Sequence, residues 1–149
     1  MRARAARRGE DSGSVMLLTV GFVVVALVAI GVVTDVSAAF LQRRSLAALA
    51  DSAALAGAQV VDLDAYYAGV PDGEPLPLDR GAARQRVLDH LRRAGAWSAF
   101  PGLVVEVAAS DGAVVTVRLR ADLRPPLSSA LGLAPGVARA EARATLTRR

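Results

Sequence analysis

The stretch VMLLTVGFVVVALVAIGVV, residues 15–33, decides the fold because it places a long apolar helix near the start of the chain. The run contains no charged side chain. An α-helix rises about 1.5 Å per residue, so the run spans roughly 29 Å, close to the thickness of a bilayer's hydrocarbon core. Thr19, Gly21 and Gly31 are compatible with such a helix, since glycine is common in spans and a hydroxyl can bond back to the backbone. We therefore predict a transmembrane helix over residues 15–33.

Positive charges before this run predict its orientation. They are Arg2, Arg4, Arg7 and Arg8, whereas the first charge after the run is Asp35. Arginines beside a span normally mark the cytoplasmic side. We therefore predict a single-pass protein of the cell membrane, with residues 1–14 as a basic cytoplasmic head and residues 34–149 as an extracytoplasmic domain. A net charge of +4 would also suit a nucleic-acid binder. However, the densest cluster of arginines is better explained by its role in orienting the membrane span. We therefore expect no nucleic acid as a partner.

A cleaved signal peptide is the alternative to a retained anchor. Val36-Ser37-Ala38 has the small-residue pattern of a signal-peptidase site. However, the apolar run exceeds the usual apolar length of a signal peptide, about 7–15 residues, and Asp35 lies inside the cleavage region. We therefore expect the anchor to be retained.

Composition excludes several kinds of site. The 149 residues suffice for about one domain, and without cysteine there is neither a disulfide nor a thiolate metal site. His90 is the only histidine, and Asp62 and Asp64 have no further ligands nearby in the sequence, which argues against a metal site or a catalytic triad. No nucleophile–base pair or phosphate-binding loop appears. We expect no enzyme, no cofactor and no small-molecule substrate.

Residues 34–61 predict a helix that continues straight out of the membrane, because they contain no proline and only Gly57 near the end. Apolar side chains at spacings of three and four form one stripe along it. The stripe consists of Leu46, Leu49, Ala53, Ala56 and Val60. The polar side carries Arg43, Arg44, Asp51 and Gln59. Ala54 flanks the stripe and need not lie in the core. The stripe covers the protein's own sheet, packs in part on partner subunits, or does both.

A second helix is predicted after a turn-rich linker at residues 61–78, which contains three prolines. Asp79 is the expected N-cap of a helix over residues 79–95, and Gly95 is the expected stop. The inward face consists of Ala83, Val87, Leu91 and Ala94, with Leu88 at its edge. The opposite face is basic, with Arg84, Arg86, Arg92 and Arg93, and is typical of a solvated surface.

Strict alternation of apolar and polar residues predicts three strands within residues 102–148. The first two form a hairpin around Ser110-Asp111-Gly112. We expect a three-residue loop with Gly112 left-handed, which pairs Val107 with Val115 and Val105 with Val117 and keeps the apolar side chains on one face.

Pro125-Pro126 ends the second strand, a short crossing segment follows, and residues 138–146 form the third strand. The expected fold class is α+β. A single N-terminal transmembrane helix continues into a long extracytoplasmic helix, and this helix packs on a small antiparallel β-sheet.

The arginine-rich head, the span and the sequence RRSLAALADSAALAGA after it resemble Flp (tight adherence, Tad) pilus-assembly proteins of the TadE/TadG type, in particular the short actinobacterial-type members. The resemblance covers roughly residues 9–60. The residues that match the motif most clearly are Asp35, Phe40, Arg43, Arg44 and Asp51. It implies a pilin-like plan and, as partners, membrane lipid and other pilus-assembly or pilin-like subunits.

One departure from prepilins bears on the role. Prepilins of this system carry a glutamate at the fifth position after a cleavage-site glycine, whereas Ser14 follows Gly9 and Leu18 follows Gly13 at that distance. This favours an uncleaved, TadG-like membrane component of a pilus assembly or secretion apparatus. The alternative is a secreted or anchored envelope domain, unrelated to pili, that binds anionic surfaces or partner proteins.

Overall fold

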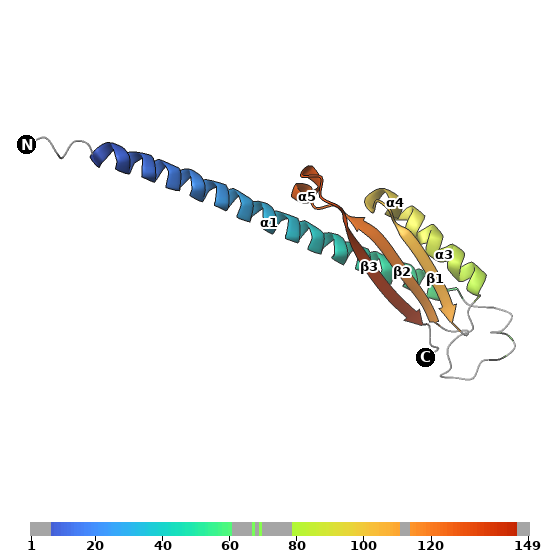
Figure 1. Ribbon diagram of the computed structural model, residues 1–149. Coiled ribbons are helices and arrows are strands. Elements are labelled where there is room, and N and C mark those ends of the chain that lie inside the picture. Colours follow the sequence, from blue (N-terminus) through green and yellow to red (C-terminus); the bar gives the residue numbers. More distant parts are fainter. Residues whose placement is uncertain (1–6, 61–66, 68, 70–78, 111–113, 146–149) are drawn as a thin grey trace, which may run out of the picture.

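The computed structural model describes residues 7–60, 67, 69, 79–110 and 114–145. Within them the elements are α1 (Arg7–Ala58), α3 (Arg80–Arg93), α4 (Ala96–Ala99), β1 (Val104–Ser110), β2 (Val114–Leu123), α5 (Pro126–Ala130) and β3 (Gly136–Thr145). Figure 1 shows a long helix that carries a small sheet over its C-terminal half. The α+β class with a long N-terminal apolar helix is confirmed.

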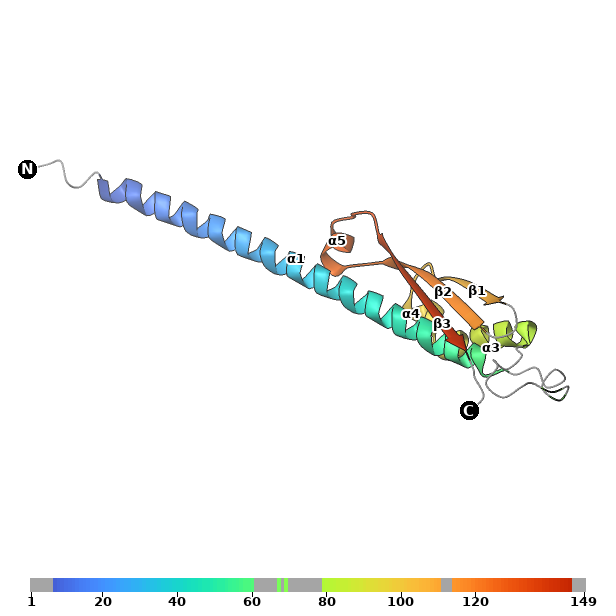
Figure 2. The ribbon, with the colours of Figure 1, turned by 90° about the horizontal axis from the view of Figure 1, so that it is seen from below.

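Helix α1 runs for 52 residues without a break. No proline occurs in it, so nothing in the sequence interrupts its backbone hydrogen bonds. The expected span and the expected helix beyond it are therefore one element, which at about 1.5 Å per residue is roughly 78 Å long. Its N-terminal half extends away from the rest of the fold, as both views show (Figures 1 and 2).

The sheet is an antiparallel meander in the order β1-β2-β3. α1 packs on β2 and β3, and α3 packs on β1 and on α1, so both helices cover the same face of the sheet. The side chains of β2 alternate, with Val115, Val117, Leu119, Ala121 and Leu123 buried against the helices. This alternation is what the sequence predicted.

The register of the hairpin differs from the prediction. Val107 pairs with Val117 and Val105 pairs with Leu119, so the strands are shifted by two residues relative to the expected pairing. A shift of two keeps every side chain on its face, and the apolar pattern therefore cannot distinguish the two registers. In the observed register, the paired residues of β1 and β2 extend as far as Ser110 and Val114. The loop between these residues, including Gly112, lies outside the described residues.

Helix α3 begins where its sequence indicates and ends slightly before the predicted bound. The Asp79 carboxylate accepts hydrogen bonds from the backbone N–H groups of Gly81 and Ala82, at 2.9 and 3.0 Å. Ala83, Val87 and Leu91 are buried. Ala94, which we expected on the same face, is instead the exposed C-cap, and Gly95 after it adopts a left-handed φ of 65°. The helix thus ends one residue too early for Ala94 to reach the core.

Candidate functional site

The first half of α1 has the properties of a membrane-spanning helix. It is the one helix among the described residues that is long and apolar enough to cross a membrane. Its apolar side chains are exposed, among them Leu18, Phe22 and Ile30 at 75%, 73% and 62%. The Thr34 hydroxyl donates a hydrogen bond to the Ile30 carbonyl at 2.9 Å, so this polar group is satisfied within the helix. Such a surface is compatible with a membrane anchor.

Asp35 joins this apolar segment to the C-terminal part of the chain. Its carboxylate oxygens accept hydrogen bonds from the backbone N–H groups of Leu127 and Ser128, at 2.7 and 2.8 Å. The Ser128 hydroxyl donates a third hydrogen bond to the same carboxylate. Leu127 and Ser128 belong to the first turn of α5, whose own N-cap is Pro125 and makes no side-chain cap. Asp35 therefore caps a helix that lies far from it in the sequence.

The physical reason for this contact is the set of unpaired N–H groups that every helix presents at its N-terminus. A carboxylate there satisfies the donors and also interacts favourably with the positive end of the helix dipole. Proline cannot supply a capping side chain, so the N-cap of α5 leaves these donors open to an acceptor from elsewhere. In this fold α1 supplies it.

Two further residues of α1 lie against neighbouring parts of the C-terminal region, one at α5 and one at the end of β2. Gly31 lies so close to α5 that an added Cβ would come within 2.5 Å of Leu127 Cδ2. About two turns after Asp35, the Gln42 side chain donates from Nε2 to the Asp122 carbonyl at 3.0 Å and accepts at Oε1 from the Arg124 N–H at 3.3 Å. Neither Gly31 nor Gln42 was singled out as a contact residue by sequence reasoning.

The ionisation of Asp35 is coupled to this contact. Partial desolvation raises the pKa of its carboxyl, but the hydrogen bonds from Ser128 and Leu127 outweigh it, so the pKa lies below the ordinary value of 3.8. A carboxyl whose folded pKa is depressed stabilises the docked state above its unfolded pKa. That stabilisation is lost as the pH falls through the folded pKa.

We accordingly predict that Asp35→Ala releases the first turn of α5 at neutral pH, because two backbone donors lose their acceptor. Hydrogen exchange of the Leu127 and Ser128 amides in the detergent-solubilised full chain measures this, and both amides should lose most of their protection. The matched control is Asp51→Ala, an exposed aspartate on the same helix, which should leave both amides unchanged. Full protection in Asp35→Ala would contradict the capping role.

In the unsubstituted chain, we expect the same amides to lose protection only below about pH 4.

The second half of α1 supplies the core of the domain. The residues of α1 that are buried are Leu46, Ala50, Ala53, Ala54, Gly57 and Ala58. The predicted stripe is therefore right for Leu46 and Ala53, whereas Leu49, Ala56 and Val60 are only half-buried. Ala54, whose environment the sequence left open between the core and a subunit contact, is 1% exposed and lies in the core. Ala58 is buried as well, so the core face of α1 extends beyond the predicted stripe on this side.

The remaining motif residues lie on the outer side of α1. Phe40 is 62% exposed, and Arg43, Arg44 and Asp51 are exposed as well. Arg7 and Arg8 belong to α1, whereas Arg2 and Arg4 lie outside the described residues. Asp62 and Asp64 also lie outside them.

His90 has a structural contact that the sequence did not predict. Its Nε2 lies 3.0 Å from the Ser52 hydroxyl, which ties α3 to α1. The described residues contain no group of three or more histidine or acidic side chains that could hold a metal ion.

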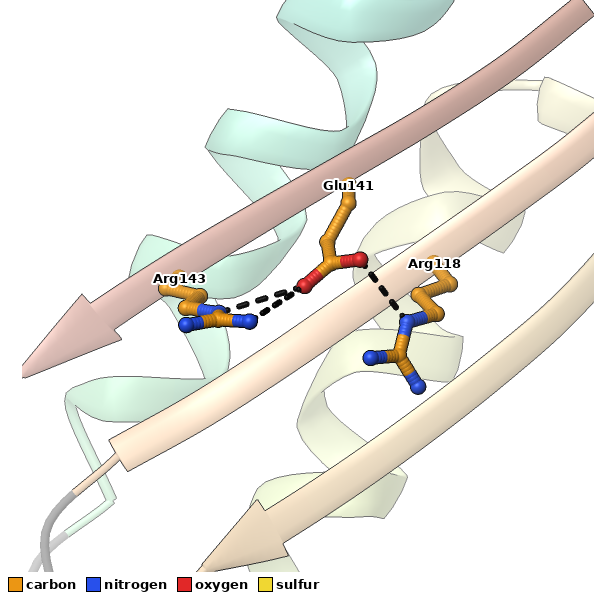
Figure 3. Close-up of polar contacts among 3 residues, drawn as sticks. All are labelled: Arg118, Glu141 and Arg143. Carbon is orange, nitrogen blue, oxygen red and sulfur yellow. Dashed lines mark hydrogen bonds and ion pairs between the residues drawn. The ribbon is translucent and has the colours of Figure 1, made fainter.

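The face of the sheet away from the helices carries charged side chains. Glu141 accepts hydrogen bonds from Arg118 Nε and from Arg143 Nη2, both at 2.9 Å (Figure 3). These bonds, from Arg118 and then Arg143, lower the pKa of the Glu141 carboxyl. All three side chains are at least 39% exposed, and exposed ion pairs contribute little to stability. This arrangement is typical of a solvated sheet face.

These features define a class of protein, in which one long apolar helix carries a small antiparallel sheet against its C-terminal half. Residues 13–60 match the family model of Tad, described as Flp pilus-assembly TadE/G-like. This match confirms the resemblance expected from the sequence. The matched residues include all of α1 from Gly13 to its end at Ala58. Comparisons with curated proteins and with solved structures find no match.

Proposed function

We propose that this chain is a non-enzymatic, membrane-anchored component of a Tad-type (Flp) pilus assembly or secretion apparatus. Residues 15–33 anchor it, the N-terminus is cytoplasmic and the α+β domain lies outside. The observation that carries the proposal is the coincidence between the family match at residues 13–60 and one uninterrupted helix. That helix is an exposed apolar surface in its first half and the core of a folded domain in its second half.

The polar groups of the domain support a structural role. Among the described residues, no polar or charged side chain is buried. Catalytic groups are usually held in partly desolvated clefts, where burial and neighbouring charges adjust their pKa values. Here the charged groups with a shifted pKa, such as Asp35 and Glu141, are engaged with a helix terminus and with arginines. These hydrogen bonds explain the lowered pKa of both carboxyl groups without a bound substrate.

The surface offered to partner subunits is the side of α1 away from the sheet. Leu41 and Leu55 are 61% and 58% exposed there, and the exposed Ala48 lies between them. The three residues repeat every seven positions, which keeps them on one line along a helix and is the spacing of helix–helix contacts. We propose that a pilin-like subunit packs its own helix along this line.

We expect Leu55→Glu to abolish surface pili in a strain that depends on this gene, because it places a charge in the subunit contact. Complementation of the deletion strain, with pili counted by electron microscopy, measures the effect. The control, Ala47→Glu, introduces the same charge at an exposed residue of α1 that lies off this line and should restore pili fully. Both variants should fold with changes of about 0.5 kcal/mol or less, as surface substitutions do. Normal piliation of the deletion strain itself would favour the alternative, an envelope domain unrelated to pili.

The absence of an acidic residue at the fifth position after Gly9 and after Gly13 supports a chain that prepilin peptidase does not cleave. The chain extracted from membranes then retains residues upstream of Gly13. It acts as an anchored assembly component rather than as a processed pilin.

A further inference from the structure

The segment between β2 and β3 has an unusual composition for an exposed connection. No charged residue occurs between Arg124 and Arg139. Its three leucines are exposed, with Leu127 at 38%, Leu131 at 66% and Leu133 at 59%. A cluster of exposed large apolar side chains on a small domain marks an interaction surface.

The position of this segment indicates what the leucines contact. Figures 1 and 2 both show α5 beyond the end of the sheet, beside the middle of α1. The leucines line one groove together with Leu27, Val28 and Val32 of the apolar run. Leu27 precedes Val33, the last residue of that run, by six residues, which is roughly 9 Å along a helix. The groove therefore lies at the depth of the outer end of the predicted span.

The backbone N–H groups of the segment also have hydrogen-bond partners within the protein. In lipid, every backbone N–H must find a partner within the protein. Pro125 and Pro126 have no N–H, and Asp35 accepts those of Leu127 and Ser128. The N–H groups of the following turn donate to carbonyls of the same segment. The last of these hydrogen bonds runs from the Leu133 N–H to the Ser128 carbonyl, at 3.0 Å.

We propose that α5 and the turn after it, residues 125–133, are a second membrane contact that inserts Leu127, Leu131 and Leu133 into the outer leaflet beside α1. The inference rests on the membrane anchoring proposed above. Elements that lie in the interface reach about 5–10 Å into the headgroup and acyl boundary, which agrees with the position of the groove. Lipid is the occupant because the leucines continue the same surface that the span presents to lipid. The segment fixes the domain against the membrane, and Asp35 fixes the segment to α1.

The chain contains no cysteine, so single-cysteine variants of the full chain can carry a fluorescent label. Leu131→Cys places the label in the segment, Val24→Cys places it in the span, and Ser98→Cys places it on exposed α4 as a water-facing control. Each variant is reconstituted into phosphatidylcholine–phosphatidylglycerol vesicles at about one chain per vesicle. Aqueous iodide and spin-labelled lipids, with the spin label near the headgroup or near the chain end, then quench the label according to its depth.

We expect the label at Leu131 to be shielded from iodide and quenched most by the shallow spin label. The label at Val24 should be quenched most by the deep one, and that at Ser98 only by iodide. If the Leu131 label is as accessible to iodide as the Ser98 label while Val24 remains deep, the second membrane contact is wrong and the anchor stands. Shielding from iodide without quenching by either lipid overturns it as well, because protein then covers the leucines. If the Val24 label is not quenched by lipid, the anchor itself fails.

Discussion

Ala53→Asp is expected to unfold the extracytoplasmic domain or to destabilise it by several kcal/mol. Ala53 is 0% exposed and lies where α1 packs on the sheet, so an aspartate there would be a buried charge without a partner. The fluorescence of Trp97, the only tryptophan, reports unfolding of the full chain in detergent as denaturant is added. Gln59→Asp, at an exposed position directly after α1, is the control and should cost about 0.5 kcal/mol or less. Equal stability of the two variants would contradict the assigned core face.

Gly57→Leu is expected to have the second largest effect, because three elements meet at this glycine. A Cβ at Gly57 would lie 2.7 Å from Val87 Cγ2 of α3 and 3.1 Å from Val115 Cγ1 of β2. Both neighbours are valines, whose branched side chains are stiff, so α3 or the sheet must move. Overpacking of a core typically costs about 1–3 kcal/mol, and leucine should reach at least the upper end of that range.

The same denaturant titration measures the effect of Gly57→Leu. Ala47→Leu introduces the same side chain on the exposed face of α1 and should leave the unfolding midpoint nearly unchanged. A normal midpoint for Gly57→Leu would show that α3 packs more loosely on α1 than the structure indicates.

The elements themselves could be predicted because each has a clear period. The charge-free run predicted the first half of α1, the Asp79 cap predicted the start of α3, and alternation over residues 138–146 predicted β3. The centre of the buried stripe could not be placed as well. Between residues 46 and 58, most candidates are alanines, which are small enough for either environment, so Leu46 and Leu49 decided the expected face. The environment of Ala54 was consequently left open.

The contact of Asp35 with α5 could not be predicted, since it joins residues far apart in the sequence and depends on where the sheet ends. Asp35 was recognised only as part of a family motif, without a physical role. A signal for the helix was nevertheless present, because Pro126 at the first position of a short helix is typical of a helix start. The stripe of Gly31, Asp35, Gln42 and Leu46, at helical spacing, also indicated that the packed face of α1 begins inside the apolar run.

The central claim is that residues 15–33 cross the membrane and leave the α+β domain outside. The direct measurement is a pair of fusions after Arg149, one to alkaline phosphatase, which is active only outside the cytoplasm, and one to a fluorescent protein that matures only inside. We predict an active phosphatase and a dark fluorescent fusion, both in the membrane fraction after alkaline carbonate extraction. A fluorescent fusion with an inactive phosphatase would contradict the orientation predicted from Arg2, Arg4, Arg7 and Arg8, and release of both fusions by carbonate would contradict the anchor.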